Sequence, residues 1–259
     1  MITENDIRKS LRTKVFGKAI YSFDTINSTN IFAKSLKEAD CPDGTLIVAD
    51  EQTAGKGRQG RRWSSQKGMN LLFSVVTRPR LVQEKMRVLP FGAALAVAGA
   101  IEQRTQIKAE CKWPNDVLIE GKKVAGMLIE TTTQNDDLMT VILGIGININ
   151  QTEFPDDIKQ KATSLKLASH QNVDRVGLLC AVLEELEHRF EQLRHFSPQI
   201  ILDEWKRRTP MLGGEITLVE HQSSIRVRAR DVAPNGALII EELNGGRREV
   251  FAGDVSILQ

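Results

Sequence analysis

One glycine-rich stretch decides whether the chain has a dinucleotide-binding fold: Gly55-Lys56-Gly57-Arg58-Gln59-Gly60-Arg61-Arg62-Trp63. Its glycines have the G-x-G-x-x-G spacing of a dinucleotide-binding turn. A Rossmann turn needs a helix directly after it and an acidic residue about 20 positions further on. Here a loop and then a strand over 70–76 are expected, and residues 75–81 contain no acid. A P-loop needs Lys followed by Ser or Thr after the last glycine, where Arg61 and Arg62 stand instead. The stretch therefore predicts a loop between strands.

The same loop is rich in positive charge. Four cations, Lys56, Arg58, Arg61 and Arg62, lie within residues 55–62, which contain no large apolar side chain to drive burial. Ordering such a segment costs about 1–2 kcal/mol per residue. We therefore expect a loop that stays disordered until a polyanion binds, with arginine forks on phosphate oxygens and Trp63 stacked on a purine. A solvated surface loop and a nucleic-acid patch remain as alternatives, although the second would require more interleaved aromatic residues.

Outward from the loop, apolar runs separated by turns predict a mixed α/β domain. Strands are expected at 45–49, 70–76 and 138–150, and a hairpin at 116–131 with its turn at Gly121. Helices are expected at 31–36, from Pro90 to about 104, at 174–196 and at 197–207. The long apolar runs indicate a sheet with one well-buried face.

The pattern changes after Pro210. Residues 213–259 alternate apolar and polar side chains between turns at 234–236 and 244–246. This pattern predicts a small all-β module, a barrel with short strands. We therefore expect two domains, 1–210 and 211–259.

Composition excludes several classes of protein. The 259 residues carry a net charge of +2 and are 41% hydrophobic, so no global basic field points to nucleic acid or an anionic membrane. The cysteines, Cys41, Cys111 and Cys180, form no CxxC pair, which argues against a zinc or redox site and suits a reducing cytoplasm. The charged N-terminal segment is not a secretion signal, and the apolar run near 89–101 is too short to span a membrane.

Three further segments carry residues suited to a site. In Cys111-Lys112-Trp113-Pro114-Asn115-Asp116, the proline and the Asn-Asp pair favour a tight turn before a strand. Lys123 follows the next turn, and Gly126 interrupts its strand, which indicates a bulge or a close backbone approach. Residues 144–150 alternate glycine or asparagine with isoleucine, so one face is bare and could take a ligand beside Asn148. Each feature alone has a structural explanation, but together with the basic loop they indicate a site.

Taken together, these segments resemble a biotin–protein ligase. The matching stretches follow the family's order and are 28–30, 51–63, 112–116, 123–130 and 144–148. The similarity extends over about residues 20–258, and the combination is specific although each motif alone is moderately so. The resemblance implies an α+β catalytic domain, with a mixed, largely antiparallel sheet packed by helices, followed by a small SH3-like β-barrel.

The resemblance also implies a two-step reaction. The carboxylate of biotin attacks the α-phosphate of ATP, with Mg²⁺ held by ATP rather than in a protein cage, and pyrophosphate leaves. A lysine of the biotin carboxyl carrier protein, a subunit of acetyl-CoA carboxylase, then attacks biotinyl-5′-AMP. Cations must offset the repulsion between the two anions, and a closing loop must exclude water. A lipoate or other acyl-protein ligase would share the chemistry, and a nucleic-acid-binding protein using the basic loop is the alternative of another class.

The family's roles can be carried over residue by residue. The catalytic residues would be Lys112, Asp116, Lys123 and Arg58. The biotin contacts would be Ser28, Thr29, Asn30, Gln52, Gly55, Gly57, Arg58, Gly60, Lys123 and Gly126. The ATP contacts would be Lys56, Arg58, Arg61, Trp63, Lys112, Asn115 and Asn148. Among these, Lys112 would bridge the biotin carboxylate and the α-phosphate, and Asp116 would lie where the acceptor amine is handled.

Two departures from the family limit the carry-over. Many bacterial members begin with a helix-turn-helix module, and only about two dozen residues precede the first motif here. We therefore expect no repressor role and no nucleic-acid partner. Leu258 stands where some members have an arginine that reaches the nucleotide, which leaves the nucleotide role of the small module open. The sequence does not fix the oligomeric state, and a homodimer is one option.

Overall fold

The larger domain is built on a seven-stranded mixed sheet. The computed structural model describes residues 1–134, 138–220 and 223–258. The strands are β1 (Ile20–Ile26), β2 (Thr45–Gln52), β3 (Leu71–Thr77), β4 (Glu110–Lys112), β5 (Asp116–Ile119), β6 (Lys122–Gln134) and β7 (Leu138–Ile147). Their order is β1-β2-β3-β7-β6-β5-β4, and β1–β2 is parallel whereas the other neighbours pair antiparallel. The mixed, largely antiparallel sheet is therefore confirmed.

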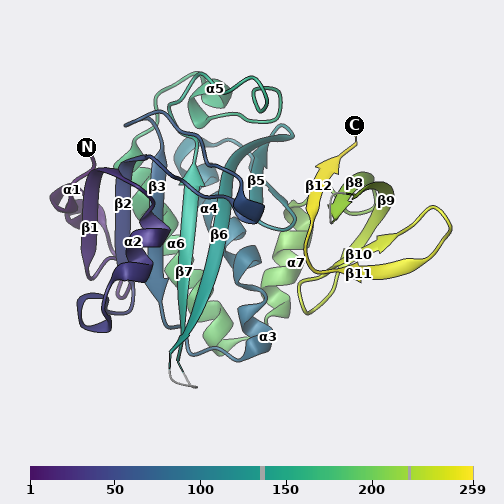
Figure 1. Cartoon of the computed structure of the whole chain (residues 1–259), viewed down its shortest axis with the longest axis horizontal. Coiled ribbons are helices and arrows are strands. Elements are labelled where there is room, and N and C mark those ends of the chain that lie inside the picture. The colour runs from purple at the N-terminus through teal and green to yellow at the C-terminus, as the bar shows by residue number, and fades with distance from the viewer. Residues whose placement is uncertain (135–137, 221–222, 259) are drawn as a thin grey trace.

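Helices cover both faces of this sheet (Figure 1). α4 (Leu89–Thr105), α6 (Arg175–His195) and α7 (Gln199–Arg208) lie on one face, and α2 (Thr29–Ser35) lies on the other. Pro90 occupies the first turn of α4, whose many alanines and glycines allow close packing, and Gln106 caps its C-terminal end with a left-handed φ of 59°. The side chain of Asp174 caps α6 by accepting from the backbone amides of Val176 and Gly177. These helices confirm the expected ones to within a few residues.

Strand β7 separates a closely packed face from a bare one. Val141, Leu143, Ile145 and Ile147 belong to the main core beneath α4 and α6. Ile142 points the other way, into a small cluster with Ala33 of α2. Because side chains alternate along a strand, Gly144 and Gly146 share the α2 face. The bare surface predicted from the Gly-Ile alternation is confirmed, and it becomes the floor of the site described below.

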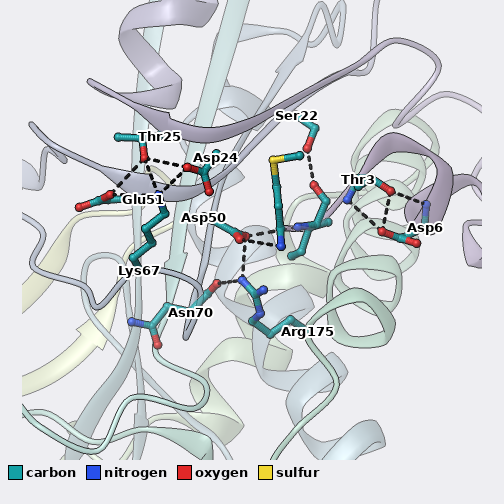
Figure 2. Close-up of polar contacts among 12 residues, drawn as sticks. Thr3, Asp6, Ser22, Asp24, Thr25, Asp50, Glu51, Lys67, Asn70 and Arg175 are labelled. Atoms are coloured by element: carbon teal, nitrogen blue, oxygen red, sulfur yellow. Dashed lines mark hydrogen bonds and ion pairs between the residues drawn. The ribbon is translucent and has the colours of Figure 1, made fainter.

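A buried polar network joins the end of β2 to the start of α6 (Figure 2). Arg175 Nη1 donates to Asp50 Oδ1 at 2.9 Å and to the carbonyl oxygen of Asn70 at 3.2 Å. Asn70 in turn accepts from the Ile149 amide at 2.9 Å and donates to Gln151 Oε1 at 2.6 Å. Burial by itself would raise the pKa of Asp50, but Arg175 outweighs it and the pKa lies below its usual value. The network fixes the ends of β2 and β7 relative to the start of β3.

The C-terminal module is a five-stranded antiparallel sheet. Its strands are β8 (Glu215–Glu220), β9 (Ser223–Val232), β10 (Leu238–Glu241), β11 (Arg247–Val250) and β12 (Asp254–Ile257), in the order β11-β10-β9-β8-β12. The expected turns fall between β9 and β10 and between β10 and β11. The module lies beside α7 (Figure 1), and Trp113 Nε1 donates across to the carbonyl oxygen of Gly236 at 3.2 Å. The indole therefore ties the module to the Lys112 corner.

Several short elements were not expected from the sequence. They are α1 (Glu4–Ser10), β1, η1 (Glu38–Asp40), η2 (Arg58–Gly60), α3 (Gln83–Met86), β4 and α5 (Leu165–Ser169). The side chains of β1 are half-buried or exposed because the strand lies at the sheet edge, so it lacks a clear alternation. The predicted third strand was too long: β7 ends at Ile147, and the Asn148 amide turns to the Val124 carbonyl at 2.8 Å.

Among the helices that the structure describes, none is long and apolar enough to cross a membrane.

Candidate active site

The sequence motifs meet around one cavity of about 330 Å³ on the α2 face of the sheet. The predicted site residues that line it are Ser28, Thr29, Asn30, Gln52, Lys56, Gly57, Arg58, Arg61, Trp63, Lys112, Asn115, Asp116, Lys123, Gly126 and Asn148. A larger hollow of about 580 Å³ lies between residues 119–122 and 152–168 and contains none of these side chains. We place the site in the smaller cavity because the charged and polar groups converge there.

Gly55 and Gly60 lie outside this lining and shape the loop instead. The Gly55 carbonyl accepts from the Trp63 amide at 2.9 Å, and a methyl group on Gly55 would lie 3.0 Å from the Trp63 carbonyl oxygen. Gly60 has a φ of +74°, which favours glycine. Both glycines therefore allow the loop to fold back on itself, and their predicted contact with biotin stays a prediction.

Two lysines and one carboxylate form the charged centre of the cavity. Asp116 lies opposite Lys112 in the β4–β5 hairpin, and the Lys112 Nζ–Asp116 Oδ2 distance is 3.1 Å. Lys123 Nζ lies 2.6 Å from Asp116 Oδ1. Burial alone would raise the pKa of Asp116, but Lys123 and Lys112 outweigh it, so the pKa lies below its usual value. The carboxylate thus holds two ammonium groups side by side.

A bulge and a glycine make room for Lys123. The β5–β6 register shifts between Val117 and Leu118, so that Val124 has no partner in the ladder. A methyl group on Gly126 would lie 2.8 Å from Lys123 Nζ and 3.1 Å from the Trp63 ring. The close approach predicted at Gly126 is therefore confirmed.

The basic loop is a narrow fold-back that reaches over the cavity. Lys56 and Arg62 bridge its two arms, and η2 forms its tip with Gln59 in the left-handed region at φ 54°. Arg58 Nη1 donates to Asn115 Oδ1 at 3.3 Å. Burial lowers the pKa of Arg58, partly offset by the nearby carboxylates. Lys56 and Arg62 form no ion pair within residues 1–134, 138–220 and 223–258. The expected ordering of this loop by a polyanion stays a prediction.

The floor of the cavity is covered by one aromatic ring. A methyl group on Gly146 would lie 2.5 Å from the Trp63 indole, and Lys123 Nζ lies 5.5 Å from the ring centroid. Among the residues with described placement, Trp63 Nε1 and Asn148 Oδ1 are buried without a hydrogen-bond partner. Asn148 Nδ2 donates to the Thr163 carbonyl at 3.1 Å, which fixes the direction of the amide. Buried polar atoms of this kind call for water or a ligand.

A chain of polar contacts closes the other end of the cavity. Gln52 Oε1 accepts from the Thr29 amide at 2.7 Å, and Ser74 Oγ lies 2.7 Å from Thr29 Oγ1 and 2.6 Å from Asn30 Oδ1. Asn30 Nδ2 donates to Glu130 Oε2 at 2.8 Å. The sequence reasoning missed Ser74 and Glu130. A polar residue inside the apolar run 71–76 was the available signal for Ser74.

The C-terminal module also contributes to the cavity, which the sequence reasoning missed. Asp254, Val255 and Ser256 of β12 line it, whereas Leu258 does not. Arg61 forms an ion pair with Asp254, and Lys112 Nζ donates to the Val255 carbonyl at 3.2 Å. These contacts join distant parts of the chain: Lys112 and Val255 are 143 positions apart, and Arg61 and Asp254 are 193 positions apart. No local pattern could have indicated them.

The fold and the cavity define an α+β protein whose main polar cavity is lined by several lysines and arginines. Residues 22–148 match the Biotin/lipoate A/B protein ligase family, and residues 211–258 match the Biotin protein ligase C terminal domain. The chain is 36% identical over 260 residues to the bifunctional ligase/repressor BirA of Bacillus subtilis, covering 99% of this chain and 79% of that protein. The chain belongs to the biotin protein ligase family and is a ligase.

Two further relatives agree with this assignment. The biotin–[acetyl-CoA-carboxylase] ligase of Mycobacterium tuberculosis is 34% identical, over 88% of this chain and 85% of that protein. The solved structure of the Aquifex aeolicus biotin protein ligase in complex with biotin and ATP is 31% identical, with a TM-score of 0.79, over 93% of this chain and 99% of that chain. The family and the fold class expected from the sequence are therefore confirmed.

Proposed function

We propose that this ligase activates biotin to biotinyl-5′-AMP, releases pyrophosphate, and transfers the biotinyl group to a lysine of the biotin carboxyl carrier protein of acetyl-CoA carboxylase. The observation that carries the proposal is the pair of ammonium groups held by Asp116 inside a cavity roofed by the basic loop. The complex of the Aquifex aeolicus relative with biotin and ATP, and the name of the Mycobacterium tuberculosis relative, support the choice of substrates.

The first step joins two anions. An oxygen of the biotin carboxylate attacks the α-phosphorus of ATP, and the bond from that phosphorus to the bridging oxygen breaks as pyrophosphate leaves. Lys112 and Lys123 offset the charge on the carboxylate and the α-phosphate, because their Nζ atoms both lie within hydrogen-bond reach of one carboxylate, Asp116. Arg58, Arg61 and Lys56 face the same cavity and would offset the departing pyrophosphate.

The second step breaks the mixed anhydride. A neutral lysine amine of the carrier attacks the acyl carbon, the bond from that carbon to the phosphate oxygen breaks, AMP leaves, and the nitrogen releases one proton to solvent. Because the pKa of Asp116 lies below its usual value, this carboxylate is a weak base near neutral pH. We assign Asp116 to orienting the lysines and the incoming amine rather than to removing a proton.

Magnesium would enter with ATP. Within the described residues no three His, Cys, Asp or Glu side chains form a cluster suited to a metal ion, and Asp116 is already engaged by two lysines. These residues fit a cation that is held by the phosphate oxygens of ATP rather than by protein side chains. When bound, it would supply further charge compensation at the phosphates.

The polar end of the cavity suits the ring of biotin. Thr29, Asn30 and Gln52 carry donors and acceptors there that are now paired with one another, with Ser74 and with Glu130. A ureido group, which both donates and accepts, would exchange with these contacts. Trp63 packs on the glycine floor, so the other face of its indole would offer an apolar surface for a purine, and Asn148 Oδ1 is a buried acceptor without a partner among the described residues. We therefore assign ring recognition to Thr29, Asn30 and Gln52, and nucleotide recognition to Trp63 and Asn148.

Pyrophosphate release separates this proposal from its rivals. With ATP and Mg²⁺ we expect release that depends on biotin and does not occur with lipoate. The match of residues 211–258 to the Biotin protein ligase C terminal domain favours biotin over lipoate. Release with lipoate alone would overturn the choice of acid. A salt-dependent gel shift of DNA without ATP consumption would favour the nucleic-acid alternative. Because all three cysteines are buried and unpaired, we place the reaction in the reducing cytoplasm.

A further inference from the structure

Three consecutive residues of the small module hold three cations of the site. Asp254 forms an ion pair with Arg61, the Gly253 carbonyl accepts from Arg58 Nη1 at 3.5 Å, and the Val255 carbonyl accepts from Lys112 Nζ at 3.2 Å. The partner residues lie on the basic loop and at the β4–β5 corner. The start of β12 is therefore the point where the module contacts the catalytic cations.

Asp254 differs from the other two because it adds a negative charge to an anion-binding cavity. The side chain of Arg61 is 58% exposed and that of Asp254 is 31% exposed, so water and an incoming ligand can reach the pair. A carboxylate in this position forms an ion pair with the arginine that a phosphate would otherwise bind. Its charge is closer to that of one phosphate group than to that of a triphosphate.

The ligand charge changes during the reaction derived above. ATP brings about four negative charges, whereas the phosphate of biotinyl-AMP brings one after pyrophosphate has left. A triphosphate can compete for Arg61, but a single phosphodiester-like group next to Lys112 and Lys123 has little need of it. Asp254 is the acidic side chain with which Arg61 pairs when no ligand is bound.

We propose that Asp254 is a positioning residue that returns Arg61, and with it the basic loop, to the C-terminal module once pyrophosphate has left, so that the loop retains the acyl-adenylate. This inference rests on the proposed adenylation. The triphosphate draws Arg61 away from Asp254, and the loss of pyrophosphate lets the pair form again. Arg61 and Asp254 lie 193 positions apart in the sequence, and both line the cavity, so their pair closes one side of it.

A second ion pair between the same two domains provides a matched control. Lys206 Nζ on α7 lies 2.6 Å from Asp231 Oδ1 on β9, outside the lining of the cavity. Asp231→Asn removes a carboxylate from the same module without touching the loop. If Asp254 only helps the module to dock, the two variants should behave alike.

The test measures how fast the intermediate leaves. Enzyme loaded with biotin, ATP and Mg²⁺ is freed of small molecules, and the dissociation of biotinyl-AMP is followed after dilution. We expect Asp254→Asn to accelerate dissociation about two- to tenfold, the range for a partly exposed charged contact, without raising the KM for ATP. Arg61→Gln tests the pair from the loop side and should also accelerate dissociation, with the double variant no faster than the faster single one. Asp231→Asn should match wild type.

The outcomes separate the two proposals. If wild type forms biotinyl-AMP and Asp254→Asn releases it at the wild-type rate, the positioning role is wrong while the adenylation stands. An equal acceleration in Asp231→Asn would also overturn the role, because docking alone would explain it. If wild type forms no biotinyl-AMP, the proposed function itself fails and takes this inference with it.

Discussion

The lysine pair and the basic loop carry the same sign of charge but are built differently. Lys112 and Lys123 are 19% and 35% exposed, and they share Asp116, which is itself 12% exposed, within one antiparallel hairpin region. Arg61 is 58% exposed and depends on a partner in another domain. The lysines are therefore fixed before any ligand arrives, whereas the loop keeps its charges available. The difference separates a preorganised catalytic centre from a clamp whose partners change during the reaction.

The largest effect is expected at the lysine pair. Lys112→Ala should slow biotin-dependent pyrophosphate release about ten- to a hundredfold, because a charge-assisted contact contributes about 1.5–3 kcal/mol. The rate is measured at saturating biotin and ATP. Lys108→Ala is the control, since that side chain is 82% exposed and its ion pair with Glu110 lies outside the cavity. An unchanged rate in Lys112→Ala would remove the lysine from the chemistry.

Replacing the shared carboxylate tests the preorganisation itself. Asp116→Asn leaves two lysines without their counterion, and we expect a loss of about 1–3 kcal/mol in the free energy of unfolding at pH 7. Because the folded pKa of Asp116 is lowered, its contribution is present above the unfolded pKa of about 3.9 and is lost as pH falls through the folded pKa.

Thermal unfolding at several pH values checks this prediction. The difference in unfolding free energy between wild type and Asp116→Asn should stay constant from pH 7 to about 5 and disappear below about pH 4. A difference that widens toward low pH would mean that the sign of the coupling between Asp116 and the lysines is wrong.

On the other side of the comparison, Arg58→Gly tests retention by the loop. Arg58 reaches both Asn115 and the Gly253 carbonyl, so its loss opens the loop at two points. We expect biotinyl-AMP to escape and to label lysines of a bystander protein about tenfold more than wild type does. The label is read by streptavidin blotting of a mixture with serum albumin. Labelling at the wild-type level would mean that the loop does not hold the intermediate.

The smallest effect is expected for Lys56, a loop cation that pairs with no acidic side chain among the described residues. Lys56→Gln should raise the KM for ATP about two- to threefold, and the difference from wild type should shrink at high salt because exposed charges are screened. Lys67→Gln is the control, since Lys67 pairs with Asp24 and Glu51 away from the cavity. A salt-independent loss in kcat would place Lys56 with the lysine pair instead.

Local pattern was enough to predict the charged centre and the floor of the cavity, whereas Ser28, Thr29, Asn30 and Gln52 were predicted only from the resemblance to the family. The Gly-Ile alternation over 144–149 gave the bare floor, and the Pro-Asn-Asp turn gave the corner that brings Lys112 opposite Asp116. Lys123 and the close approach at Gly126 followed from one hairpin. These features depend on residues within about a dozen positions of each other, where strand periodicity and turn chemistry decide the geometry.

The parts that could not be predicted depend on distant contacts. Asp254 meets Arg61 because the module docks on the larger domain, through contacts that include Trp113 on Gly236 and Lys206 on Asp231, and no spacing in the sequence encodes that docking. The edge strand β1 was missed since half-exposed side chains lack a period. Trp63 illustrates a third case: its place in the cavity was predicted, but not that its ring covers Gly146.

Mass spectrometry under native conditions tests the central claim most directly. Wild type, Lys112→Ala and Lys123→Ala are each incubated with ATP, Mg²⁺ and biotin and then freed of unbound ligand. The paired ammonium groups predict that wild type retains the added mass of biotinyl-adenylate and that both variants lose most of it. Wild type without that mass, or both variants with wild-type occupancy, would contradict the proposal that this lysine pair brings the two anions together.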